Sequence, residues 1–157
     1  MKLLFRQRFF SWFDSYDIYD EAGNTVYTVE GKLAWGHCLH ILDASGTHIA
    51  TLREEPLTLF FPTFHMFFGE REIGTVTKEF SLFRPCFTVD YNGWIVEGDF
   101  FEWDYEILCG GNVVASVAKE LFHLTDTYEI DVKNPADALG ALMVVLAIDA
   151  EKCSRSK

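Results

Sequence analysis

Hydrophobic and polar residues alternate along most of this chain, in short segments separated by glycine-containing turns. The clearest alternation runs from Phe101 to Ile107, where aromatic residues and isoleucine occupy one set of positions and three acids occupy the other. A period of two is typical of a strand with one buried and one solvated face, which suits an antiparallel sheet. The pattern therefore predicts a mainly β fold.

Two segments, Ile18–Val26 and Ile41–Ile49, share the order apolar-apolar-Asp-x-x-Gly-x-x-apolar. Aspartate closes such a turn through the backbone and glycine takes the φ > 0 position, which is hairpin chemistry. Related turns follow at Gly69, at Asn92-Gly93 and at Gly110-Gly111-Asn112. We expect about twelve strands, near residues 3–8, 15–20, 25–31, 37–43, 47–54, 63–68, 71–80, 85–91, 94–99, 101–109, 112–120 and 127–132.

The pattern changes once, after the last expected strand. Asn134 is a good helix N-cap, Pro135 suits the first helical position, and Asp137 meets the positive end of the helix. These signals predict a helix from Pro135 to about Ala150, roughly 24 Å long at about 1.5 Å per residue. Lys152 and Arg155 follow its other end.

The middle of this helix, from Ala138 to Ile148, has no charged or hydrogen-bonding side chain, so it has to be buried all round. A bilayer would need about 20 apolar residues, and a helical bundle would need other helices. A wide β-barrel is the container that is left, because twelve strands enclose more space than their own side chains fill. We therefore predict one domain over residues 1–157, a closed antiparallel barrel of about twelve strands around one apolar C-terminal helix.

Net charge restricts the partners. The chain has 24 acids against 13 basic residues, which gives a formal net charge of −11. Nucleic acid is bound by clustered lysine and arginine, so it is excluded as the main partner, and anionic lipid is disfavoured by the same sign of charge.

The four cysteines, Cys38, Cys86, Cys109 and Cys153, show no disulfide or zinc spacing, so we expect free, mostly buried thiols in a reducing compartment. The N-terminal segment mixes arginine into its apolar stretch, and we interpret it as a folded strand rather than a signal peptide. The expected location is cytoplasmic, with no transmembrane segment and with a peripheral membrane position as the alternative.

Three clusters are candidate sites. Trp35–His40 contains His37, Cys38 and His40, but only the last two would share a strand face, and zinc needs three or four ligands. Glu102, Asp104 and Glu106 form an acidic row at spacings of roughly 7 Å. A solvated face is expected there, and weak Ca²⁺ or a basic partner is the alternative.

The third cluster, Leu59–Phe68, is the most apolar stretch. We expect core packing for it, with an exposed patch for a partner or a membrane as the alternative. Catalytic signatures such as G-x-S-x-G, H-E-x-x-H, the P-loop and the dinucleotide fingerprint do not occur in the sequence. We assign no catalytic, cofactor-binding or metal-binding residue and expect no cofactor.

The expected architecture resembles the tubby C-terminal-like fold, which is shared with phospholipid scramblases. Within it, the segments Gly98–Ile107, Asp126–Tyr128 and Ala147–Asp149 resemble the LURP-one-related family. The resemblance covers nearly the whole chain and implies the fold, but no enzymatic activity. Tubby domains are associated with phosphoinositides through basic residues, and this chain has no matching basic cluster. No functional residue is carried over from the family.

The first functional hypothesis is a non-enzymatic domain that binds a protein partner or an apolar ligand through the outer surface or mouth of a filled barrel. The second is a peripheral membrane or lipid-binding protein related to scramblases. The third is an enzyme with a site that histidines and acids assemble in space. The sequence does not determine the oligomeric state.

Overall fold

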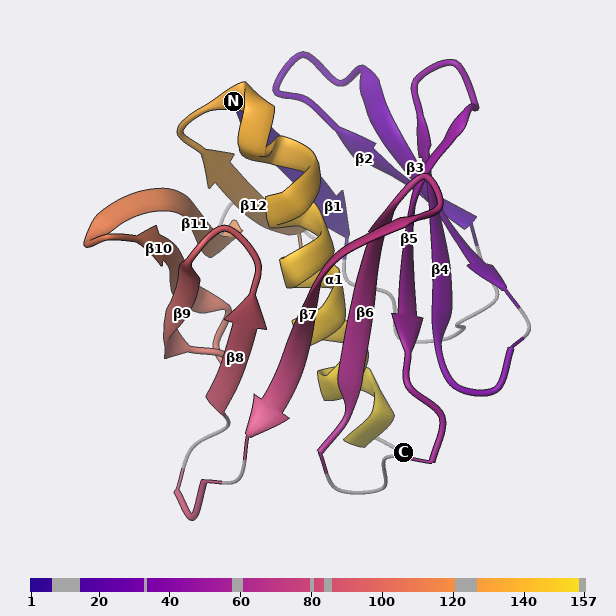
Figure 1. Cartoon of the computed structure of the whole chain (residues 1–157). Helices are drawn as coiled ribbons and strands as arrows, with labels where there is room; N and C mark the ends of the chain where they lie inside the picture. The colour runs from indigo at the N-terminus through magenta and orange to yellow at the C-terminus, as the bar shows by residue number, and fades with distance from the viewer. Residues whose placement is uncertain are drawn as a thin grey trace.

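The computed structural model describes residues 1–6, 15–32, 34–57, 61–79, 81–83, 86–120 and 127–155, with side chains up to residue 151 in the last range. Figure 1 shows the twelve strands and the helix that these residues form. The strands are β1 (Lys2–Arg6), β2 (Ser15–Tyr19), β3 (Thr25–Lys32), β4 (Cys38–Asp43), β5 (His48–Glu54), β6 (Thr63–Phe68), β7 (Arg71–Glu79), β8 (Cys86–Asp90), β9 (Trp94–Asp99), β10 (Asp104–Cys109), β11 (Asn112–Glu120) and β12 (Thr127–Val132).

These strands form one antiparallel sheet in the order β8-β7-β6-β5-β4-β3-β2-β1-β12-β11-β10-β9. Consecutive strands pair with each other, apart from β8 and β9, and β1 also pairs with β12, from Lys2↔Asp131 to Arg6↔Thr127. That long-range pairing curls the sheet into a nearly closed barrel, with β8 and β9 as the outermost strands of the hydrogen-bonded order. The predicted twelve-stranded antiparallel barrel is confirmed.

The two Asp-x-x-Gly segments form the tight turns that their sequences predict. In the second, the Asp43 carboxylate accepts hydrogen bonds from the backbone N–H groups of Ser45 and Thr47, at 2.9 and 3.0 Å. Gly46 has φ 86°, a left-handed conformation that a side chain would strain. Local chemistry therefore sets these connections, which is why the sequence predicts them well.

The helix begins as predicted and continues further. The Asn134 side chain accepts a hydrogen bond from the N–H of Ala136 at 3.1 Å, and a 3-10 turn covers Pro135–Asp137. The α-helix, α1, then runs from Ala138 to Arg155. The predicted end near Ala150 is wrong, and the next residue, Glu151, forms a buried ion pair with Lys78 of the barrel wall.

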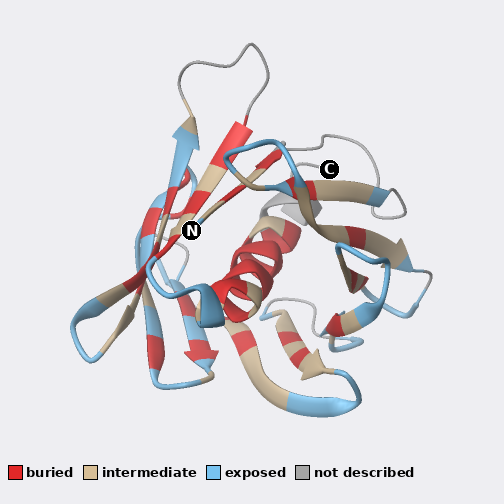
Figure 2. Cartoon of the chain, turned by 90° about the horizontal axis from the view of Figure 1, so that it is seen from above, coloured by how far each residue is buried: buried red, intermediate tan, exposed pale blue. Residues whose placement is uncertain are grey.

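Helix α1 fills the barrel. Figure 2 shows it in the centre of the ring of strands, coloured as buried along most of its length. Every residue from Ala141 to Ile148 is at most 1% exposed. Gly140 allows a close approach, because a Cβ there would lie 2.9 Å from the ring of Tyr91 and 3.1 Å from that of Trp94. The prediction that this apolar segment is the core of the barrel is confirmed.

One strand boundary differs clearly from the prediction. Strand β10 begins at Asp104 rather than at residue 101, because the Asp99 carboxylate accepts hydrogen bonds from the N–H groups of Phe101 and Glu102 and closes a turn. Trp103 then takes φ 55° and stacks on Tyr128 at 3.8 Å between ring centroids. Phe101 is 56% exposed, so its expected inward position is wrong.

The interior also holds an ion pair that the sequence pattern did not reveal. Lys78 of β7 and Glu151 of α1 lie 2.5 Å apart, and each side chain is only 6% exposed. Removing two charges from water is costly unless they pair closely. This pair therefore joins the last turns of α1 to the barrel wall.

Candidate binding surfaces

The barrel has two different ends. Because successive connections in a meander alternate between the ends of the sheet, residues 20–24, 44–47, 69–70, 91–93 and 110–111 gather at one end, here called the turn end. The opposite end of the barrel, here called the loop end, holds the described residues of the remaining connections: 34–37, 55–57 with 61–62, 81–83 and 100–103. Figure 1 shows the β7–β8 and β5–β6 connections and the C-terminus at the same, lower end.

Four large apolar side chains project from the loop end. Trp35, Leu57, Leu82 and Phe83 are between 77% and 91% exposed, and they come from three separate connections. Leu57 also has φ 68°, a conformation that a branched side chain disfavours. Such exposure has no packing reason within the described residues, and a gathering of large apolar side chains at one end is typical of an interaction surface.

Backbone hydrogen bonds hold the supports of these side chains together. The N–H of Glu54 donates to the carbonyl of His37 at 2.7 Å, and that of Lys78 donates to Pro62 at 3.0 Å. The His37 ring also pairs with the Glu54 carboxylate. Burial acts to raise the pKa of Glu54, but the hydrogen bonds from His37 outweigh it and lower that pKa. The segments next to the exposed side chains are thus connected to each other by hydrogen bonds and an ion pair.

The apolar stretch 59–68 divides between its two interpretations. Leu59 and Phe60 lie outside the described residues. Phe64 and Met66 of β6 are buried in the core, as core packing requires, whereas Phe61 is 46% exposed at the loop end. The strand part therefore packs, and the part before the strand contributes to the surface.

The Trp35–His40 cluster does not assemble a metal site. Cys38 is buried, His37 is paired with Glu54, and the ring of His40 stacks on His48 at 4.1 Å. In the described part of the chain, no group of three His, Cys, Asp or Glu side chains is arranged to hold a metal ion.

The free cysteines have different environments. Cys38 is buried, Cys86 is exposed and Cys109 is half-buried, and the side chain of Cys153 lies outside the described residues. The expectation of mostly buried thiols is therefore wrong for Cys86, which begins the outer strand β8 next to a connection.

The acidic row is exposed, but it is not one row on a strand. Asp104 and Glu106 belong to β10, whereas Glu102 lies in the preceding turn. The regular spacing that the sequence predicts is therefore wrong for Glu102. Exposure of all three agrees with the expected solvated face.

Histidine–carboxylate pairs form that the sequence does not reveal, because their members lie on different strands or loops. His37 pairs with Glu54, and His65 pairs with both Glu72, at 2.5 Å, and Glu55, at 3.5 Å. These pairs are where an enzymatic alternative would begin, since a histidine held by a carboxylate can act as a base.

The described helices include none with the length and apolar character that crossing a membrane requires.

The sequence and the fold were compared with those of known proteins. The chain is 25% identical to protein YxjI of Bacillus subtilis (strain 168) over 150 residues, which is 95% of this chain and 92% of that protein. An X-ray structure of a protein from Arabidopsis thaliana has the same fold, with a TM-score of 0.65 and 19% identity, over 96% of this chain and 90% of that one. Residues 1–149 match the family described as LURP-one-related. With almost the whole barrel and its central helix inside that match, the chain belongs to the LURP-one-related family.

Proposed function

We propose that this chain is a non-enzymatic binding domain that takes a protein partner on the loop end of its filled barrel. The observation that carries the proposal is the exposure of Trp35, Leu57, Leu82 and Phe83 at that end. The interior offers no comparable place, because α1 occupies it. A partner is left to bind at the mouth or on the outer surface.

The side-chain types suit this role. Tryptophan, phenylalanine and leucine supply large contact areas, and aromatic anchors often dominate the free energy of an interface. Leu57 adds backbone strain at an exposed position, and strain of this kind is concentrated at functional sites.

Site-specific photo-crosslinking tests the proposal. A photoreactive amino acid replaces Leu82, and the protein is irradiated in extract of its source cells. Ile95 of β9, which is 50% exposed and follows the turn end, is the matched control position. We expect a discrete protein adduct from position 82 and none from position 95.

A second arm uses the variant Trp35→Ser, Leu57→Asn, Leu82→Ser and Phe83→Ser. Asparagine tolerates the left-handed conformation of residue 57 better than serine does. With the photoreactive amino acid moved to another loop-end position, the adduct should disappear in this variant, while the melting temperature does not fall below that of the parent. Equal adducts from positions 82 and 95, or an adduct that the variant retains, would contradict the proposal.

A lipid surface is the second candidate, and one observation favours it. The exposed side chains come from three separate connections rather than from one helix or strand, and a deformable surface accepts such scattered apolar tips more easily than a rigid one does. Tryptophan also suits the interface between lipid and water.

Flotation with liposomes decides between the two. The exposed apolar side chains predict binding to neutral vesicles, and the net charge of −11 predicts exclusion from anionic vesicles at low salt, where repulsion is least screened. The fourfold variant should lose flotation, and an Ile95→Ser variant should keep it. If the parent stays with neither vesicle, the lipid candidate is wrong.

A further inference from the structure

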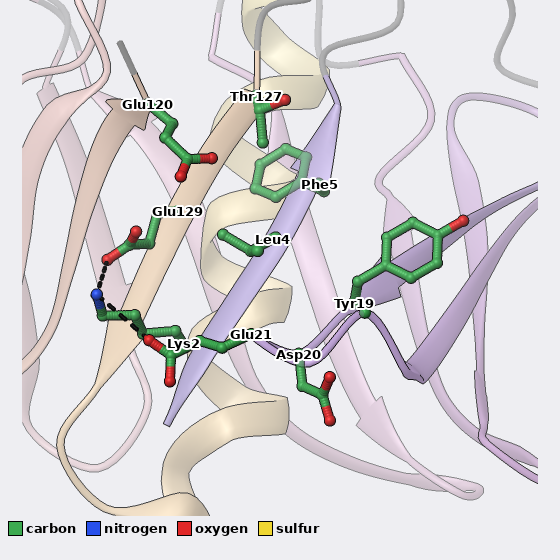
Figure 3. Close-up of a pocket in the computed structure, with 10 residues that line it drawn as sticks. Lys2, Leu4, Phe5, Tyr19, Asp20, Glu21, Glu120, Thr127 and Glu129 are labelled. Atoms are coloured by element: carbon green, nitrogen blue, oxygen red, sulfur yellow. Dashed lines mark ion pairs between the residues drawn. The ribbon is translucent and has the colours of Figure 1, made fainter. Parts of the chain in front are cut away.

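A groove of about 470 Å³ lies on the outer face of the barrel (Figure 3), and its lining includes none of Trp35, Leu57, Leu82 and Phe83. It runs over β1 and β12, and the β2–β3 turn borders it. Leu3 and Phe5 point into the core, so the alternate residues Lys2 and Leu4 of β1 face outward. Leu4 is paired in register with Glu129 on one side and with Tyr19 on the other. Leu4 and Tyr19 supply the apolar part of the floor.

Acidic side chains surround this floor. Glu120 and Glu129 come from β11 and β12, and Asp20 and Glu21 come from the β2–β3 turn. Within the lining, the carboxylates of Glu21 and Glu129 share the single ammonium of Lys2, and the Asp20 carboxylate adds a further negative charge. The lowered pKa of Asp20, caused first by the hydrogen bond from the Asn24 side chain, keeps that carboxylate ionised.

The groove already holds one primary ammonium group, which belongs to the chain itself. Lys2 Nζ lies 3.2 Å from a carboxylate oxygen of Glu129 and 3.4 Å from one of Glu21, as the dashed lines in Figure 3 show. These two acids come from segments more than a hundred residues apart, and the fold brings them to one cation. The arrangement is thus suited to an alkyl ammonium group that lies along an apolar floor.

We infer that this groove binds a basic segment of a partner protein, with a lysine or arginine side chain between the carboxylates and an apolar neighbour over Leu4 and Tyr19. Charge complementarity selects this occupant, because anionic ligands such as nucleic acid or acidic lipid are repelled. An open groove with exposed rim residues, such as Tyr19 and Glu21, admits a linear segment. The site is separate from the loop end and does not depend on the function proposed for it.

Lys2 competes with the ligand in this arrangement. Its ammonium must leave Glu21 or Glu129, or share them, when a second cation enters. Replacing Lys2 by methionine keeps the length of the side chain but removes the competing charge. The groove of that variant should therefore bind a basic segment more tightly than the parent does.

The test uses an acetylated and amidated hexapeptide in which two lysines alternate with two leucines between terminal glycines. Its binding to the ¹⁵N-labelled chain is followed by NMR. We expect amide shifts at Leu4, Tyr19, Gly23 and Thr127, and a Kd that rises at least tenfold in the double variant Glu21→Gln/Glu129→Gln. The Lys2→Met variant should lower Kd several-fold.

The matched control is Asp104→Asn/Glu106→Gln, which removes the same charge from exposed positions of β10 outside the groove. It should change Kd by less than twofold, and melting curves of all variants should stay close to that of the parent. Further probes are a hexapeptide with glutamate for lysine, a hexapeptide with alanine for leucine, and spermidine. The first should not bind, the second should bind more weakly, and spermidine should bind more weakly than the parent hexapeptide.

Three results would overturn the inference. An equal loss of affinity in the β10 control would show diffuse attraction to an acidic protein. Shifts confined to the loop end would place the binding on the other surface. Spermidine that binds as tightly as the hexapeptide, at the same amides, would make the groove a polyamine site instead of a docking site for protein.

Discussion

The turn end and the loop end of the barrel solve the same problem, the reversal of a strand, in different ways. At the turn end, Asp20 and Asp43 accept hydrogen bonds from nearby backbone and side-chain groups, and glycine takes the left-handed positions. At the loop end, exposed apolar side chains occupy the connections, and Leu57 takes a left-handed position where glycine would be comfortable. The turn end is thus built for folding, whereas the loop end retains features that folding does not require. That difference is the basis of the proposal that a partner binds at the loop end.

The largest expected effect comes from breaking the element that both ends share, helix α1. Val144 is fully buried at its centre, so Val144→Asp would place an unpaired carboxylate in the core. Such a charge costs at least several kcal/mol, against a typical total stability of about 5–15 kcal/mol. The variant, and a truncation after Lys133, should be insoluble or unfolded, as measured by soluble expression and circular dichroism.

An exposed acid provides the control for that experiment. Asp104→Asn lies on the outer face of β10 and should leave the melting temperature almost unchanged. A soluble truncation that melts at the parent temperature would mean that α1 is not the filling of the barrel, and the comparison of the two ends would lose its common core.

The next largest effect concerns the C-terminal half of α1, which lies toward the loop end. There Glu151 forms the buried ion pair with Lys78. Lys78→Met or Glu151→Leu alone leaves one buried charge without its partner and should cost about 3–5 kcal/mol. The double variant removes both charges and should recover most of that loss. Urea unfolding of the four proteins gives the coupling energy.

Additive losses in that cycle would contradict the pairing. A double variant that is as unstable as the worse single variant would show that packing of the side chains, and not the unpaired charge, sets the cost.

A smaller effect compares the same backbone conformation at both ends. Gly46 has φ 86°, and an added Cβ would meet nothing within 4 Å, so Gly46→Ala adds strain alone and should destabilise the turn end by about 1 kcal/mol. Leu57 has φ 68° at the loop end, and Leu57→Asn should stabilise the protein by about 0.5 kcal/mol. Opposite signs in chemical unfolding would confirm that Leu57 retains strain at the loop end that Gly46 avoids at the turn end.

The smallest effects are in the titration of two histidines. The hydrogen bond from His65 to Glu72 raises the pKa of His65, whereas burial first, and then the charge of His48, lowers the pKa of His40. His65 should therefore contribute stability that is present below about pH 6.5 and is lost as pH rises through its folded pKa. His40 should contribute in the opposite sense, with stability that falls as pH drops below about 6.5.

An NMR titration of the histidine ring protons checks both directions. Glu72→Gln should return the pKa of His65 towards its ordinary value and leave that of His40 where it is. A His65 that titrates at or below its ordinary value in the parent would show that its contact with Glu72 is not kept in solution.

Much of the fold was predictable from local patterns. The Asp-x-x-Gly turns, the alternation within strands such as β6 and β12, and the cap at Asn134 all depend on residues close together in the chain. The apolar middle of α1 has to be buried on all sides, and the expected number of strands indicated a barrel wide enough to enclose it. These inferences succeed because the physical cause, a hydrogen bond or a buried face, is written within a few residues.

The remainder was decided by contacts between distant segments. The residues near Glu151 give no sign of its ion pair with Lys78, which lies 73 residues away in the chain. The sequence prediction therefore ended α1 too early. The Asp99 carboxylate accepts hydrogen bonds from the backbone N–H groups of Phe101 and Glu102 and closes a turn where the alternation predicted a strand. Phe101 is therefore exposed. The groove also exists only because β1 pairs with β12 and brings Lys2 between Glu21 and Glu129. The barrel, its turns and its central helix follow from patterns between residues close together in the chain. Which charges meet and which apolar side chains remain exposed depends on long-range strand pairing, so local patterns do not reveal either.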